Sequence, residues 1–130
     1  MVETGTSESV IVICLLPVAP VPSCSTDQVF TGGTVLVLDR IGDPGNAGTA
    51  IRSAAAFSCS GVVFLKGSAF PWNPKVSRSS AGLNSTVSVA EAESLAALKC
   101  TYSNYRYVGA SAAGRRVSDI KETDSLCLVI

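Results

Sequence analysis

Two short apolar runs with a helical segment between them constrain the fold of this chain most strongly. The runs are residues 34–39 (TVLVLD) and 61–66 (GVVFLK), and their β-branched and aromatic content indicates buried strands. Between them, residues 46–57 space alanine and isoleucine so that one helix face is apolar. Because such an order suits parallel strands joined by a crossover helix, it predicts neighbouring parallel strands.

The same alternation extends over the rest of the chain. Pro74 suits the first turn of a short helix, and Glu91 and Glu93 suit the positive amino end of a longer one. The further predicted segments are a strand at 9–16, a loop at 17–33, a helix at 73–81, a strand at 87–89, a helix at 90–103, and strands at 105–110 and 126–130. The sequence therefore predicts an α/β fold whose mostly parallel sheet carries helices on both faces.

The composition fits one folded domain with an uneven charge distribution. Of the 130 residues, 47% are hydrophobic and 15% are charged, which is enough to fill a buried core. The formal net charge is zero, yet residues 1–39 contain no lysine or arginine, while residues 40–90 contain five basic residues and one acidic residue. The basic segment suits an anionic partner such as RNA phosphate, and a solvated basic face is the alternative.

Several classes of site and location are disfavoured by residue usage. The chain has no histidine, and its cysteines at 14, 24, 59, 100 and 127 form no CxxC pair, so neither imidazole catalysis nor a metal site is predicted. The apolar run at 10–16 is shorter than the ~20 residues needed to span a bilayer, and the acidic start MVETGTSE is unlike a signal peptide. We predict reduced thiols, no membrane partner and a cytoplasmic location, with a chloroplast or mitochondrion as the alternative.

The segment that joins the first two strong strands gathers candidate site residues. Asp43-Pro44-Gly45-Asn46 predicts a turn in which Asn46 caps the helix, and Arg52 lies one helical turn after Gly48. The missing side chain at Gly48 would leave a track along which the Arg52 guanidinium reaches back toward Asn46. An arginine and free helix amides at a strand-to-helix turn suit a ribose phosphate. A surface arginine and a glycine that packs against the sheet are the equally weighted alternative.

The glycine spacing weighs against two other nucleotide sites. Gly42, Gly45 and Gly48 are three residues apart, and Pro44 interrupts them, so they do not form a GxGxxG fingerprint. No Gly-Lys pair followed by serine or threonine is present for a P-loop. A Rossmann-like nucleotide-binding module is therefore disfavoured.

Two longer stretches resemble a known family. DPGNAGTAIRSAAAF at 43–57 resembles the first signature motif of the SpoU-type (TrmH-like) RNA 2′-O-ribose methyltransferases of the SPOUT class. GVVFLKGSAFPWNPKVSRSSAG at 61–82 resembles that family's next strand, loop and N-P-K-x-x-R-x-S-x-G segment. The resemblance is close over 34–90 and looser over 91–130. It assigns 34–130 to the N-terminal portion of the methyltransferase domain, and 1–33 to a linker and first strand that lead from an accessory RNA-binding region.

The resemblance implies a function and a set of site residues. The expected reaction is methyl transfer from S-adenosylmethionine to a ribose 2′-hydroxyl of rRNA or tRNA, and the family's motif places Asn46 and Arg52 at the active site. An arginine side chain is a poor base, because its unperturbed pKa is about 12 or higher. We therefore expect Arg52 mainly to orient the hydroxyl and hold the adjacent phosphate. The other expected contacts are RNA binding by Arg40, Lys75 and Arg78, and cofactor binding by Gly109, Ala110 and Ser111. A homodimer is expected for the family.

The family's later motifs lie outside this sequence. A Gly-x-Glu-x-x-Gly turn and a helix that starts with Ser-Leu-Asn would follow LCLVI at 126–130. In the family these motifs carry most of the cofactor pocket, the trefoil knot and much of the dimer interface. We therefore expect a SPOUT-like α/β knot fold without its C-terminal knot segment, with weak cofactor binding, activity and dimerisation. A non-catalytic RNA-binding remnant of such an enzyme is the alternative.

Overall fold

The computed structural model describes residues 26–111, 113–114, 116, 119–120 and 125–130. Their helices and strands are α1 (Thr26–Val29), β1 (Gly33–Leu38), α2 (Pro44–Ala56), β2 (Gly61–Leu65), α3 (Pro74–Ser79), the 3-10 turn η1 (Leu83–Ser85), β3 (Val89–Ala92), α4 (Leu95–Thr101), β4 (Arg106–Gly109) and β5 (Ser125–Val129). The predicted strand at 9–16 lies outside the described residues. The predicted loop at 17–33 was wrong at its end, which contains the one-turn helix α1.

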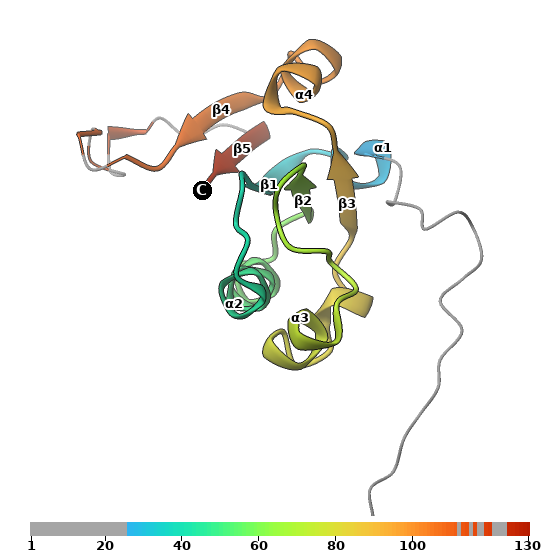
Figure 1. Ribbon diagram of the computed structural model, residues 1–130. Coiled ribbons are helices and arrows are strands. Elements are labelled where there is room, and N and C mark those ends of the chain that lie inside the picture. The colour runs from blue at the N-terminus through green and yellow to red at the C-terminus, as the bar shows by residue number, and fades with distance from the viewer. Residues whose placement is uncertain (1–25, 112, 115, 117–118, 121–124) are drawn as a thin grey trace, which may run out of the picture.

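The described strands form one sheet, in the order β3-β2-β1-β5-β4, and every neighbouring pair is parallel. The predicted parallel α/β fold is confirmed, and β1 is its central strand. Helices α2 and α3 lie on one side of the sheet, and α1 and α4 lie on the other (Figure 1). The predicted strands that became β1, β2, β4 and β5 agree with the structure to within about one residue, β5 being a residue earlier at each end.

Alternate residues of β1 enter two separate cores. Leu36 and Leu38 pack on the α2 side with Ile51, whereas Val35 and Val37 pack on the opposite side. Side chains alternate between the two faces of a strand, so a strand that is covered on both faces needs an unbroken apolar run. The run TVLVL in 34–38 meets that requirement.

The start of α2 differs from the prediction. Asp43, not Asn46, is the N-cap, and its Oδ2 accepts a hydrogen bond of 2.8 Å from the backbone N–H of Asn46. Pro44 follows as the first helical residue, where its fixed φ and missing N–H favour a helix start. Asn46 therefore lies in the first helical turn.

Gly48 allows α2 and α3 to approach each other closely. A Cβ atom at Gly48 would lie 1.9 Å from Ser79 Oγ and 2.7 Å from the backbone nitrogen of Ser80. The predicted track for Arg52 along Gly48 was wrong, because α3 occupies that space. The alternative of a packing glycine is correct, although the neighbour is α3 rather than the sheet.

The segment after η1 was assigned incorrectly from the sequence. The strand is β3 instead of 87–89, and α4 begins only after Ser94, whose Oγ accepts a hydrogen bond from Ala97 N. Pairing with β2 continues to Ala92, so the long-range ladder prevails over local helix preference in this segment. Glu91 and Glu93 consequently lie four and two residues before Leu95, the first residue of α4, and not in its first turn.

Replacement of Gly48 tests the α2–α3 contact. The added methyl group in Gly48→Ala displaces backbone, and overpacking of this kind costs about 1–3 kcal/mol. That cost exceeds the gain in helix propensity of about 1 kcal/mol. We expect a lower free energy of unfolding in urea. Gly42→Ala is the control, because a Cβ there meets no heavy atom within 4 Å. Equal stability of the two variants would contradict the contact.

The described cysteines should differ in reactivity. Burial raises the pKa of the Cys127 thiol to about 12 and raises that of Cys59 by a smaller amount, while Cys100 is exposed. Iodoacetamide reacts with thiolates, so at pH 8 we expect mass spectrometry to show alkylation at Cys100 first, Cys59 later and Cys127 only after unfolding. Rapid alkylation of Cys127 in the native protein would contradict the β1–β5 packing.

Candidate functional site

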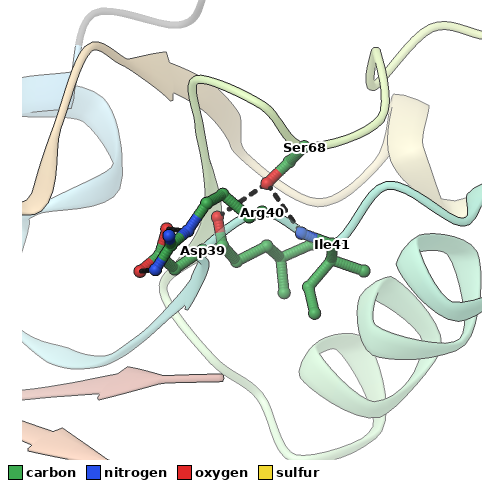
Figure 2. Close-up of polar contacts among 5 residues, drawn as sticks. Asp39, Arg40, Ile41 and Ser68 are labelled. Atoms are coloured by element: carbon green, nitrogen blue, oxygen red, sulfur yellow. Dashed lines mark hydrogen bonds and ion pairs between the residues drawn. The ribbon is translucent and has the colours of Figure 1, made fainter.

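A serine hydroxyl joins the loops that follow β1 and β2. Ser68 Oγ donates a hydrogen bond of 3.0 Å to the carbonyl of Leu38 and accepts one of 3.2 Å from the N–H of Ile41 (Figure 2). The N–H of Ala69 also donates to the carbonyl of Ile41, at 2.9 Å. These bonds fix the two loops to each other at the carboxyl edge of the sheet, where ligands bind in open α/β folds.

Arg40 lies in this locked region in an unusual backbone conformation. Its φ is 60°, a left-handed value that costs free energy in a residue other than glycine. The Ser68 bridge spans Arg40 from both sides, and Asp39 pairs with the guanidinium at 3.1 Å. A Cβ at Gly67 would lie 3.2 Å from Arg40 Cγ, so the aliphatic stem rests against the second loop. The structure thus holds an exposed guanidinium at the sheet edge, and its predicted contact with RNA stays a prediction.

Arg52 reaches toward the start of α2 along Thr49. Its Nη2 donates a long hydrogen bond of 3.4 Å to Thr49 Oγ1, which itself donates to the carbonyl of Gly45 at 3.0 Å. Asn46 and Thr49 line one cavity of about 400 Å³. The structure therefore brings Arg52 to the border of the cavity that Asn46 lines, by a path over Thr49 rather than over Gly48. Most of the remaining wall is apolar, formed by residues such as Leu36, Ala50 and Leu128.

Lys75 and Arg78 are exposed on α3, next to α2. Asn73 caps α3, and its Oδ1 accepts a hydrogen bond of 2.8 Å from the N–H of Lys75. Within the part of the chain that the structure describes, neither cation forms an ion pair. Their ammonium and guanidinium groups are thus open to an anionic partner.

The predicted cofactor residues lie at the end of β4. Gly109, Ala110 and Ser111 line a cavity of about 540 Å³, which Leu126 and Leu128 of β5 also line. This volume lies in the range of about 300–1,000 Å³ that is typical of small-molecule sites. Open space surrounds Gly109, where a Cβ would meet no atom within 4 Å. The cavity thus fits a nucleoside-sized ligand, and because Leu128 also lines the cavity beside Asn46, the two cavities lie close together.

Other kinds of site are not found in the described residues. No group of three or more Cys, His, Asp or Glu side chains among them is placed to hold a metal ion. None of their helices is long and apolar enough to cross a bilayer.

Lys66, at the end of β2, forms an ion pair with Glu93 at 2.5 Å. This hydrogen bond and the carboxylate charge raise the pKa of Lys66.

Sequence reasoning missed two residues of this region. Thr49 could have been found, because it lies three residues before Arg52 on the same side of α2. Ser68 carried no local signal, since both of its bonds reach back 27 or 30 residues to the end of β1 and the loop after it.

Comparison with known proteins identifies what the chain is similar to. The sequence model of the SpoU rRNA Methylase family matches residues 33–130. The mouse mitochondrial rRNA methyltransferase 3 is 46% identical over 55 residues, which are 42% of this chain and 13% of the mouse protein. The 23S rRNA (guanosine(2553)-2′-O)-methyltransferase RlmP of Bacillus subtilis is 35% identical over 80 residues, which are 62% of this chain and 29% of RlmP.

Solved structures agree with these sequence matches. The SpoU methyltransferase AviRb of Streptomyces viridochromogenes superimposes with a TM-score of 0.76 at 25% identity, over 84% of this chain and 46% of AviRb. AviRb in complex with the cofactor AdoMet gives a TM-score of 0.73 at 26% identity, over 84% of this chain and 45% of AviRb. This chain therefore spans less than a third of the two curated relatives and less than half of AviRb.

Removal of the Ser68 hydroxyl tests whether it fixes the two loops. Ser68→Ala leaves a part-buried carbonyl and N–H without their partner, a loss that costs about 1–3 kcal/mol. We expect a lower free energy of unfolding and faster hydrogen exchange at the Ile41 amide. Ser85→Ala is the control, because Ser85 is exposed and bonds only within its own turn, to the carbonyl of Gly82. Unchanged exchange at Ile41 in Ser68→Ala would contradict the bridge.

Proposed function

This chain belongs to the SpoU rRNA Methylase family, and we propose that it acts in the transfer of a methyl group from S-adenosylmethionine to a ribose 2′-hydroxyl of rRNA or tRNA. The observation that carries the proposal is the path from Arg52 through Thr49 to the cavity beside Asn46. Leu128 lines both this cavity and the cavity at the end of β4, which supports a site shared by the two. The names of the mouse and Bacillus subtilis relatives, which describe rRNA methyltransferases, support the same reaction class.

Three polar residues of α2 have a proposed task. The Arg52 guanidinium binds a phosphate oxygen beside the target ribose and orients the 2′-hydroxyl, while the Asn46 amide hydrogen-bonds the ribose. Thr49 positions Arg52 by accepting its hydrogen bond. The proposed contribution of Arg52 is mainly to orient the hydroxyl and to place a positive charge beside the phosphate, for which the planar guanidinium fork is suited.

The cofactor residues are proposed at the end of β4. Gly109, Ala110 and Ser111 would hold S-adenosylmethionine in the cavity of about 540 Å³ through backbone groups and the Ser111 hydroxyl. When bound, the cofactor supplies the electrophilic methyl group. The solved complex of AviRb with AdoMet supports the identity of the cofactor.

The remaining proposals concern partners and organisation. Arg40, Lys75 and Arg78 would bind the RNA backbone, and their exposure at the carboxyl edge and on α3 supports this role. Residues 1–33 would link an accessory RNA-binding region to the family domain at 34–130, and two copies would form a homodimer. The cytoplasm, with an organelle as alternative, stays the proposed location; the mouse relative's name favours a mitochondrion.

Substitution of Arg52 tests the proposed reaction. We expect Arg52→Ala to lose at least about 100-fold in methyl incorporation, because it removes a positioned charge from the transition state. Arg52→Lys should recover little of it, since an ammonium cannot reproduce the guanidinium fork. The measurement is transfer of tritiated methyl from S-adenosylmethionine to unmodified rRNA and tRNA, with circular dichroism to verify folding.

The control for this assay is Lys99→Ala, a cation removed from α4 on the opposite side of the sheet (Figure 1). Equal incorporation by Arg52→Ala and Lys99→Ala would reduce Arg52 to a surface residue. Binding of RNA by the unsubstituted protein without methyl transfer would favour a non-catalytic RNA-binding protein instead.

A further inference from the structure

Phe70 presents an aromatic ring to solvent at the carboxyl edge of the sheet. Its exposed fraction is 48%, which is high for a phenylalanine in a folded domain. It lies in the loop between β2 and α3, one residue after Ala69, which is hydrogen-bonded to Ile41 in the neighbouring loop. The ring therefore lies on the edge where the proposed reaction takes place.

Phe70 lies in a loop whose backbone is fixed by hydrogen bonds. The N–H of Asn73 donates to the carbonyl of Phe70 at 3.0 Å, which closes a turn. The buried Asn84 amide donates to the carbonyl of Pro71 at 3.0 Å, and Pro71 itself is fully buried. Because residues on both sides of Phe70 are fixed, binding through its ring would cost little conformational entropy.

Two exposed cations border the loop that carries Phe70. The stem of Arg40, from the neighbouring loop, rests against Gly67, and Lys75 lies in the first turn of α3, two residues after the Phe70–Asn73 turn closes. An exposed aromatic ring in a loop bordered by cations suits a nucleotide, whose base stacks while its phosphates pair with cations.

Phe57, the second exposed phenylalanine, has an exposed fraction of 83% and lies on the cavity that Asn46 also lines. The residues directly beside Phe70 are apolar, but Pro71 is buried, and Lys66 and Lys75 at the two ends of the loop are exposed. These positive charges favour a polyanion such as RNA over an apolar protein partner.

We propose that Phe70 stacks against an unpaired base of the RNA substrate, while Lys75 binds the backbone beside that base. The proposal rests on the proposed function and extends it by a single-stranded recognition element next to the reacting ribose. Sequence-specific RNA recognition favours unpaired bases that can stack on aromatic rings, so the target would lie in a loop, bulge or end.

The test measures binding of a fluorescein-labelled single-stranded oligoribonucleotide of mixed sequence by anisotropy, at several salt concentrations. Phe70→Ala should weaken binding by roughly 5- to 100-fold, the range of one lost base–aromatic stack. Phe70→Trp and Phe70→Tyr should bind about as well as the unsubstituted protein. Phe70→Leu should fail like Phe70→Ala, because it keeps apolar volume but has no ring.

The salt dependence separates stacking from charge. Phe70→Ala should leave the slope of log K against log salt unchanged, whereas Lys75→Ala should reduce it by about 0.7. Lys99→Ala is the control, because it removes a cation from α4 on the opposite side of the sheet and should change neither the slope nor the affinity. Thermal melts verify that each variant is folded.

The outcomes distinguish the two levels of the proposal. Absence of RNA binding by the unsubstituted protein would overturn the proposed function and the stacking with it. Normal RNA binding that is unchanged in Phe70→Ala, or fully kept in Phe70→Leu, would overturn the stacking alone. Reduced self-association of Phe70→Ala in light scattering, with RNA affinity unchanged, would overturn it in favour of a protein contact.

Discussion

The hydrogen-bonded bridge at Ser68 is the constraint on which the arrangement of the candidate site depends. Its hydroxyl bonds the carbonyl of Leu38, two residues before Arg40, and the N–H of Ile41, directly after it. The bridge supports the left-handed backbone of Arg40 and ties its loop to the loop that carries Phe70. A strained residue persists when surrounding contacts determine it so fully, and such residues gather at functional sites.

The packing of α2 determines which of its residues remain available for chemistry. Gly48 packs directly against Ser79 of α3, and this contact holds Lys75 and Arg78 beside α2. Asn46 and Thr49 line the cavity on another side of α2, and Arg52, one turn after Gly48, donates a hydrogen bond to Thr49. Leu128 of β5 lines both this cavity and the one at the end of β4.

Local patterns predicted the elements whose causes are local. The apolar runs of β1 and β2 and the Asn73-Pro74 start of α3 were all identified, because strand burial and helix capping are encoded within a few residues. The Asn46 cap was wrong because Pro44 starts the helix earlier. The helix predicted at 90–103 is present as α4, but it starts later than predicted because residues up to Ala92 pair with β2. The Gly48–Ser79 contact and the Ser68 bridge join residues about 30 apart, which no local pattern encodes.

The central claim is that the joined loops after β1 and β2 form the face that meets RNA. Hydrogen exchange with mass spectrometry, with and without a single-stranded oligoribonucleotide, tests this claim most directly. The account predicts slower exchange over residues 40–46 and 66–75, with no change over 95–101 in α4, on the opposite side of the sheet. Protection over 95–101, with 40–46 and 66–75 unchanged, would contradict it.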